Sequence, residues 1–223
     1  MSAFADFERQ LASDAYNELD VEGHEVDLQG WINPGFYECF QSVAREFSSP
    51  FVIEVGTYKG ASAVIMADTI KEGKILCVDT WLGAPEFWTH VRDMPKVNGY
   101  PTIFYKFTKN VKKLGLHNII TPFPISSQQA SDVLKTYKAQ ADIIYIDGSH
   151  DYQDVLSDYQ NSISGLAPNG IVVLDDSSLF LDQIRDYKVF QGHPGPSNIC
   201  MKYALNELEH FLSVGHLNFF RRN

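Results

Sequence analysis

The chain has 223 residues, of which 44% are apolar and 21% are charged, so it can form a large core and is not a disordered chain. Its formal net charge of -10 argues against a nucleic-acid partner, because phosphates require a basic face. No apolar run approaches the roughly 20 residues of a membrane helix. The N-terminus lacks the regions of a signal peptide. We therefore expect a cytoplasmic protein with no membrane or nucleic-acid partner and with its three cysteines reduced.

Residues 1–50 contain an acidic segment followed by a predicted helix that begins near Pro34. We expect this part to form a helical extension or lid on the rest of the chain. Residues 51–180 are expected to form the core. Residues 181–223 should add a helix over 198–212 and a short strand over 216–222. Since no second core or linker is visible, the sequence predicts one domain over 1–223.

The core alternates apolar runs with helix-like segments. Buried strands are predicted over 51–55, 74–80, 141–147 and 170–176, where apolar residues run without alternation, and a weaker one over 119–125, which contains two prolines. Helices are predicted over 60–70, 102–116, 127–138 and 151–166. This order is typical of α/β proteins with a doubly wound, mostly parallel sheet. Ser127 is the expected N-cap of the third helix.

Two segments in the first half of the core are ambiguous. The connection 81–101 carries Trp81, Phe87 and Trp88, which either line a substrate pocket or pack within a long loop. The segment 106–113 carries four lysines, which we interpret as the solvated face of a helix.

Ligands of such sheets bind beyond the carboxyl ends of the strands. Four of the five predicted strand ends carry carboxylates there. The first is followed by "EVGTYKGAS" (54–62), a glycine loop whose spacing differs from both the dinucleotide fingerprint and the P-loop. Asp79 lies 23 residues after Gly56, a distance suited to binding a ribose diol. A simple strand-to-helix turn and an acidic cap are the alternatives.

The motifs "IEVGTYKGAS", "CVDTW", "ISSQQ", "YIDGSHDY", "LAPNG" and "VVLDDSS" together resemble class I S-adenosylmethionine-dependent methyltransferases with a Rossmann-like fold. Among them the chain is similar to metal-dependent small-molecule O-methyltransferases of the catechol and macrolide-sugar types, the methyltransferase family 24-like proteins. Catechol-type enzymes carry an asparagine where Asp176 stands and a lysine where His150 stands. The macrolide type carries a carboxylate and a histidine there, so the chain resembles the macrolide type more.

The resemblance implies a role for each matching residue. The cofactor would lie against residues of three kinds: a loop around its methionine part, residues at its ribose and residues at its adenine. In chain order they would be Glu54, Gly56, Thr57, Tyr58, Gly60, Ser62, Asp79, Thr80, Trp81, Ser127 and Gln128. Asp147 would close the cofactor site and also bind a metal ion with Asp175 and Asp176.

Three carboxylates at neighbouring strand ends repel one another unless a cation joins them. Oxygen ligands favour Mg²⁺, with Mn²⁺ or Ca²⁺ as alternatives. His150, three residues after Asp147, is the predicted general base, since histidines exchange protons near neutral pH. The alternatives without catalysis are that Asp175 and Asp176 only cap a turn and that His150 only caps the helix that follows it. The other histidines have no such context: His24, His90, His117, His193, His210 and His216.

The sequence thus predicts a metal-dependent O-methyltransferase that acts on a hydroxyl of a small molecule. Sugars and natural products are the candidate acceptors. Two alternatives stay open. One is a nicotinamide-dependent oxidoreductase on the same kind of fold. The other is a non-catalytic partner of another enzyme, with "GHPGPSN" (192–198) at an interface. A homo-oligomer is compatible with both.

Overall fold

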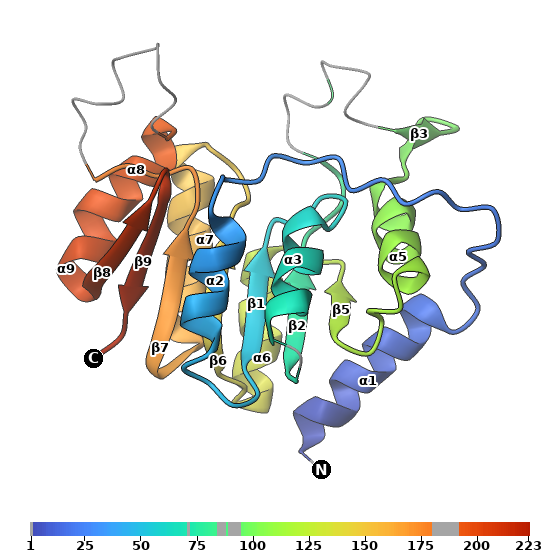
Figure 1. Cartoon of the computed structure of the whole chain (residues 1–223), viewed down its shortest axis with the longest axis horizontal. Coiled ribbons are helices and arrows are strands. Elements are labelled where there is room, and N and C mark those ends of the chain that lie inside the picture. Colours follow the sequence, from blue (N-terminus) through green and yellow to red (C-terminus); the bar gives the residue numbers. More distant parts are fainter. Residues whose placement is uncertain (1, 71, 84–87, 89–94, 180–191) are drawn as a thin grey trace.

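The computed structural model describes residues 2–70, 72–83, 88, 95–179 and 192–223. Seven strands form one sheet: β1 (Phe51–Val55), β2 (Lys74–Val78), β5 (Ile120–Phe123), β6 (Ala141–Ile146), β7 (Leu166–Leu174), β8 (Glu209–Val214) and β9 (Leu217–Arg221). Their order is β5-β2-β1-β6-β7-β9-β8 (Figure 1). The first five are parallel, and β9 joins β7 antiparallel. The predicted doubly wound, mostly parallel sheet is confirmed.

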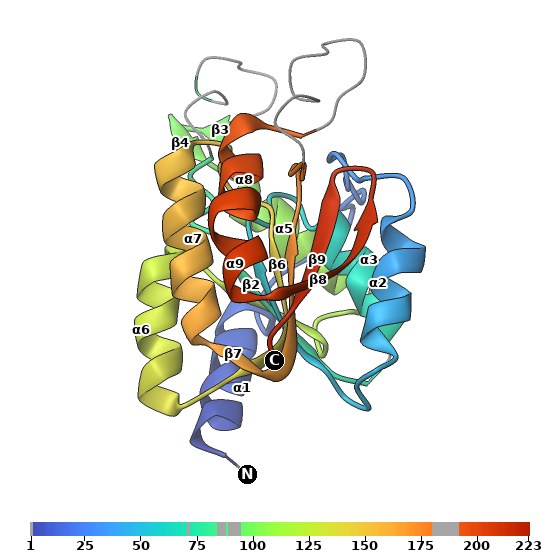
Figure 2. The ribbon, with the colours of Figure 1, turned by 90° about the vertical axis from the view of Figure 1, so that its left-hand side faces the viewer.

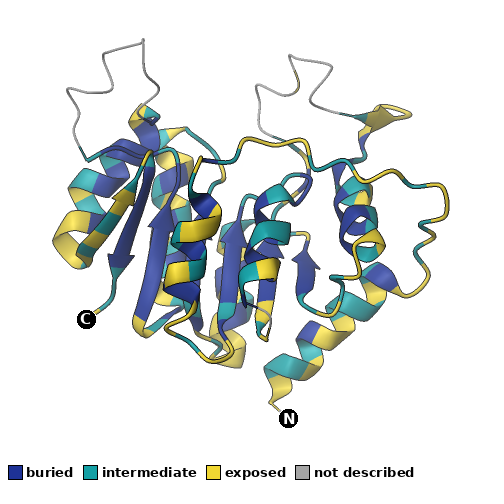
Figure 3. Cartoon of the chain, in the orientation of Figure 1, coloured by how far each residue is buried: buried dark blue, intermediate teal, exposed yellow. Residues whose placement is uncertain are grey.

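Helices cover both faces of this sheet (Figure 2). They are α1 (Ala3–Tyr16), α2 (Phe36–Ala44), α3 (Ala61–Ile70), α5 (Ile103–Lys113), α6 (Ser127–Tyr137), α7 (Tyr152–Ser164), α8 (Pro194–Ile199) and α9 (Leu205–Glu207), with a π-helical turn at Cys200–Ala204. One hydrophobic cluster joins α2, α3 and α5 to the sheet, and a second joins α6, α7 and α8 to the other face. The five parallel strands are mostly buried (Figure 3), which explains their unbroken apolar runs.

The N-terminal helix α1 closes the sheet at β5 (Figure 1). Near the start of α1, the Phe7 ring meets the Phe123 ring edge-on, with ring centroids 5.6 Å apart. At the end of α1, the Tyr16 hydroxyl donates a hydrogen bond to the Ile120 carbonyl at 3.0 Å. The edge strand β5 is thus covered on its outer side, which protects it from pairing with another chain.

Two lysines of the 106–113 segment anchor the chain that follows α1. Lys106 forms an ion pair with Asp27 at 3.0 Å, and Lys112 donates to the Leu19 carbonyl at 2.7 Å. These two lysines thus have partners in addition to solvent, because the N-terminal segment passes beside α5, although the Lys106 side chain stays exposed as predicted.

The C-terminal part differs from the prediction. Instead of one helix over 198–212, the chain forms short helical pieces that end at Glu207, and 209–214 form β8. The side chains of β8 alternate between exposed and half-buried, as on a strand covered on one side. The last predicted strand is present as β9. A small hairpin of β3 (Lys96–Val97) and β4 (Tyr100–Pro101), which the sequence did not predict, precedes α5.

The three thiols, Cys39, Cys77 and Cys200, are free, and two of them are buried, as expected. Within the described ranges, none of the helices combines the length and the hydropathy needed to cross a bilayer.

Candidate active site

The predicted carboxylates meet at one edge of the sheet because β2, β1, β6 and β7 are parallel neighbours. Glu54 lies in β1 beside Cys77 of β2 and Tyr145 of β6, and Asp147 and Asp175 follow β6 and β7 directly. The expectation that the Asp147 and Asp176 segments leave neighbouring strands is confirmed.

Asp79 organises the glycine loop. Its Oδ2 accepts hydrogen bonds from the backbone N–H groups of Thr57 and Tyr58, both at 2.9 Å, and its Oδ1 accepts one from Trp81 at 2.6 Å. Burial raises the pKa of Asp79, and these backbone donors oppose that rise. The backbone N–H of Thr80 also hydrogen-bonds this carboxylate, so main-chain donors surround Asp79 at the end of the strand.

Gly56 allows the loop after β1 to lie against the loop after β6. Its φ is +85°, and a Cβ atom there would lie 2.2 Å from the carbonyl oxygen of Asp147. No larger residue fits this contact, so Gly56 determines how closely the predicted cofactor loop approaches Asp147.

Glu54 is completely buried beneath this loop. It accepts hydrogen bonds from the Thr57 hydroxyl at 2.7 Å, from the Ser62 hydroxyl and from the Cys77 thiol at 3.3 Å. Burial raises the pKa of Glu54 to about 7, although these donors favour the charged form. In this structure Glu54 therefore stabilises the glycine loop through the hydroxyls of Thr57 and Ser62.

Trp81, one of the three aromatic residues of the connection that the structure describes, packs in the core. It is 3% exposed, its indole N–H donates to the Tyr58 carbonyl at 2.8 Å, and it contacts the Phe104 and Phe107 rings. Trp88 is exposed and lies under the Lys96 ammonium. Phe87 and His90 lie outside the described residues. Thr80, predicted to bind cofactor, is exposed at the same strand end.

The residues predicted to flank adenine begin α6. Ser126, not Ser127, is the N-cap, and it forms a capping box with Gln129. Ser127 occupies the first helical position, and its hydroxyl hydrogen-bonds the Asp158 carboxylate of α7. Gln128 is exposed, and its side chain donates to Asp132 at 3.4 Å. Both keep their predicted place at the carboxyl edge of the sheet.

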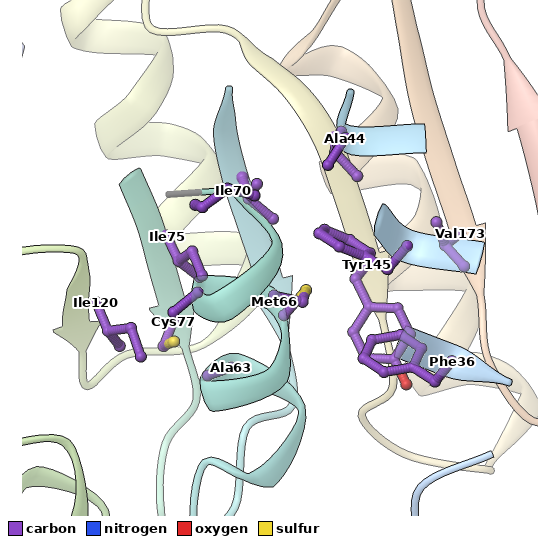
Figure 4. Close-up of a cluster of buried hydrophobic side chains, with 14 of the residues drawn as sticks. Phe36, Ala44, Ala63, Met66, Ile70, Ile75, Cys77, Ile120, Tyr145 and Val173 are labelled. Carbon is purple, nitrogen blue, oxygen red and sulfur yellow. The ribbon is translucent and has the colours of Figure 1, made fainter. Parts of the chain in front are cut away.

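Tyr145 connects two of the predicted metal ligands. Its hydroxyl donates to Asp147 Oδ2 at 3.2 Å and also hydrogen-bonds Asp175 Oδ2. The ring packs against Phe36 in the core (Figure 4). Burial raises the pKa of Asp147 well above its usual range, and the charges of Asp175 and Asp176 raise it further. Sequence reasoning missed Tyr145, although residues two apart in a strand share a face.

His150 lies beside Asp176, as its predicted role requires. Its Nε2 is 2.9 Å from Asp176 Oδ2, and its ring stacks on the His193 ring with centroids 3.7 Å apart. Gly195 permits this arrangement, since a Cβ atom there would lie 2.1 Å from the His150 carbonyl oxygen. The segment 192–198, considered above as an interface, thus forms a wall behind His150.

The statement that His193 and His216 lack a functional context is wrong. His193 Nε2 is 3.9 Å from Asp176 Oδ2, and His216 Nδ1 is 2.8 Å from Asp176 Oδ1 and 3.0 Å from Asp175 Oδ1. Burial lowers the pKa of His216, but the hydrogen bonds to both aspartates outweigh it and raise the pKa to about 9. Burial likewise opposes the charge of Asp176, yet its histidine partners lower its pKa.

Two sets of side chains at this edge have the donors and spacing for a metal ion. Asp175, Asp176 and His216 form one set, and His150, Asp176 and His193 form the other, with the ligand atoms of each set within 4.8 Å of one another. Asp147 belongs to neither set and is joined to the first through the Tyr145 hydroxyl. The donor chemistry fits a divalent cation, with nitrogen as well as oxygen ligands.

Comparison with known proteins agrees with this geometry. A family model described as a methyltransferase domain matches residues 53–177, more than half of the chain. Two relatives are an uncharacterized protein, y4gI, of Sinorhizobium fredii (23% identical, 57% of this chain, 13% of the relative) and an uncharacterized protein, R132, of Acanthamoeba polyphaga mimivirus (25%, 63% and 58%). The chain therefore corresponds to less than two thirds of the length of either relative.

Two solved structures share the fold. The O-methyltransferase TomG from Streptomyces achromogenes, in complex with S-adenosylmethionine, matches with a TM-score of 0.54 and 15% identity over 96% of this chain and 90% of its own. A putative caffeoyl-CoA O-methyltransferase from Staphylococcus aureus matches with a TM-score of 0.63 and 13% identity over 98% of both chains. The matching family model shows that the chain belongs to the methyltransferase domain family, and the two solved structures show that it shares the fold of these proteins.

Proposed function

We propose that the protein transfers a methyl group to a hydroxyl oxygen of a small molecule and requires a divalent cation to do so. The observation that carries the proposal is the juxtaposition of His150 with Asp175 and Asp176 beside the glycine loop. The proteins with similar folds are described as O-methyltransferases, and TomG is described as involved in tomaymycin synthesis. These descriptions support oxygen as the acceptor atom and a natural product as the acceptor class.

The loop of residues 54–62 would bind the cofactor, and the aspartates that follow β6 and β7 would lie beside the acceptor. Asp79 and Glu54 hold the loop of residues 54–62 in shape from two sides. S-adenosylmethionine, when bound there, supplies the activated methyl group. Asp175 and Asp176, with Asp147 joined to them through Tyr145, would hold a cation, which would lower the pKa of the acceptor hydroxyl. We propose Mg²⁺, Mn²⁺ or Ca²⁺ as this cation, in keeping with the carboxylate ligands.

His150 is the proposed general base. With Nε2 donating to Asp176, its Nδ1 carries the lone pair that takes the proton of the acceptor hydroxyl. Asp176 then pairs with the imidazolium, as a carboxylate does when it orients a catalytic histidine. Without a base in this position the proton would have to leave to water.

The N-terminal part is proposed to complete the acceptor pocket within a single domain. Asp27 is bound to Lys59 of the glycine loop at 2.9 Å, and the exposed Trp31 ring lies 6.2 Å from the Tyr58 ring. An exposed aromatic ring above the loop is suited to cover a small acceptor.

The test combines binding and turnover. Purified protein should bind S-adenosylmethionine in a calorimetric titration, and with tritiated cofactor it should label one member of a panel of sugars, phenols and macrolides. A chelator should stop the labelling, and Mg²⁺ or Mn²⁺ should restore it. Cofactor binding without transfer to any acceptor at any metal concentration would favour the non-catalytic alternative, and chelator-resistant transfer would remove the cation from the proposal.

A further inference from the structure

His216 is built into the acid edge by the antiparallel pairing of β9 with β7. Its carbonyl accepts a hydrogen bond from Ser177 N–H at 2.9 Å, which joins the start of β9 to the chain just after Asp176. Asn218, two residues further on, donates to the Ser177 carbonyl at 3.0 Å and is itself buried. One backbone hydrogen bond and one side-chain hydrogen bond therefore hold the chain at His216 beside the segment that follows Asp176.

The two ring nitrogens of His216 face different partners. Nδ1 faces Asp175 Oδ1 and Asp176 Oδ1 at 3.0 and 2.8 Å. On the other side, the Asn33 amide, in the orientation that satisfies its neighbours, places its oxygen 3.2 Å from Nε2 and 3.1 Å from the His216 backbone nitrogen. Asn33 is 5% exposed, and Gly215 packs directly on its amide.

This arrangement has the features of a metal-ligating histidine. Such a histidine donates its second ring N–H to a carbonyl or carboxylate, which sets the tautomer and aims the other nitrogen at the ion. The Asn33 oxygen is an acceptor only, so Nε2 carries the proton and Nδ1 is the atom that faces the two carboxylates.

We propose that His216 binds a divalent cation through Nδ1 together with Asp175 and Asp176, and that this centre prefers Mn²⁺ or another first-row transition ion to Mg²⁺. The inference rests on the cation requirement of the proposed function and adds the ligand that determines which cation. Imidazole nitrogen binds Mg²⁺ poorly and transition ions well, whereas carboxylates alone do not discriminate in this way. In this assignment His150 stays outside the coordination shell.

The set of His150, Asp176 and His193 is less suited to a shared ion. The two imidazole rings are nearly parallel, 11° apart, with centroids at 3.7 Å, so an ion in the plane of one ring lies out of the plane of the other. Ligands of one ion must converge from different directions. Both rings are also about a third exposed, whereas Asp175 beside His216 is buried.

The test titrates the full-length protein with Mn²⁺ and measures free Mn²⁺ by electron paramagnetic resonance, with Mg²⁺ as competitor. We expect one Mn²⁺ per chain, displaced only by a large excess of Mg²⁺. Pulsed measurements on bound Mn²⁺ should show the ¹⁴N modulation of a directly bound imidazole. His216→Asn should abolish the modulation and weaken Mn²⁺ binding about 10- to 100-fold, and Asn33→Ala should weaken it about 10-fold.

His150→Asn is the matched control, since it removes a neighbouring histidine of Asp176 and should leave the ¹⁴N signal intact. Calorimetric binding of S-adenosylmethionine to each variant verifies that it is folded. Bound Mn²⁺ without ¹⁴N modulation, modulation that survives in His216→Asn, or equal affinity for Mg²⁺ would each overturn the inference. Any of these results would leave the proposed methyl transfer standing. If the unmodified protein did not bind S-adenosylmethionine, the proposed methyl transfer would be contradicted, but the metal-binding role of His216 would not.

Discussion

His150 lies 2.9 Å from Asp176 and thereby joins the loop after β6 to the loop after β7. The two residues come from neighbouring parallel strands, so the sheet itself determines their separation.

Replacing His150 with asparagine should lower turnover about 10²- to 10⁴-fold, the usual contribution of a general base. Affinity for S-adenosylmethionine should not change, because the side chain points to Asp176 and not to the glycine loop. Steady-state kinetics and calorimetry measure the two quantities separately. His210→Asn, at a histidine that contacts Ser213 on β8, is the control. Normal turnover in His150→Asn would remove this residue from the mechanism.

Asp79→Asn should weaken binding of S-adenosylmethionine, because the amide cannot accept from the Thr57, Tyr58 and Trp81 N–H groups as a carboxylate does. A hydrogen bond to a charged acceptor contributes about 1.5–3 kcal/mol, so the Kd should rise about 10- to 100-fold. Asp14→Asn, at an exposed aspartate of α1 that accepts a hydrogen bond from Gln10, should leave the Kd unchanged. Equal affinities for the two variants would mean that Asp79 neither shapes the loop nor contacts the cofactor.

Glu54 should make the protein less stable as pH rises. Its pKa is about 7 in the folded protein and 4.5 in an unfolded chain, so the folded state holds the proton more tightly. The associated stability is present in full below pH 4.5 and is lost as pH rises to about 7, with a loss on the order of 3 kcal/mol. Urea unfolding from pH 5 to 8 should show this slope, and Glu54→Gln should flatten it. An identical slope in the variant would assign the pH dependence to other groups.

The two lysines that bind Asp27 should differ in their effect on stability. The side chain of Lys59 is 8% exposed and also donates to Gln29 at 3.0 Å, whereas that of Lys106 is 38% exposed. Lys59→Met should therefore lower the free energy of unfolding by about 1–3 kcal/mol, and Lys106→Met by less than about 1 kcal/mol. Thermal melting of the pair provides the comparison. A larger loss for Lys106→Met would show that Lys59 does not anchor the N-terminal segment.

Most of the sheet could be predicted because its strands are buried on both faces. The runs over 51–55 and 141–147 are apolar at nearly every position, and this local pattern is enough to identify a strand and the acid at its end. Since parallel strands align their carboxyl ends, Asp79, Asp147 and Asp175 could be placed at one edge without coordinates. Trp81 shows the limit, because its neighbours Phe104 and Phe107 come from a helix about 25 residues away.

The sequence alone thus determined which segments form the parallel strands, the glycine loop and the acids at the strand ends. Only the tertiary structure showed that His193 and His216 join Asp176, and that Tyr145 connects Asp147 to Asp175. His216 reaches Asp175 from 41 residues away, through a hairpin of β8 and β9 whose first strand resembled the end of a helix. Contacts of that kind depend on which strands pair across the sheet, and pairing is decided by packing of the whole core rather than by any local pattern.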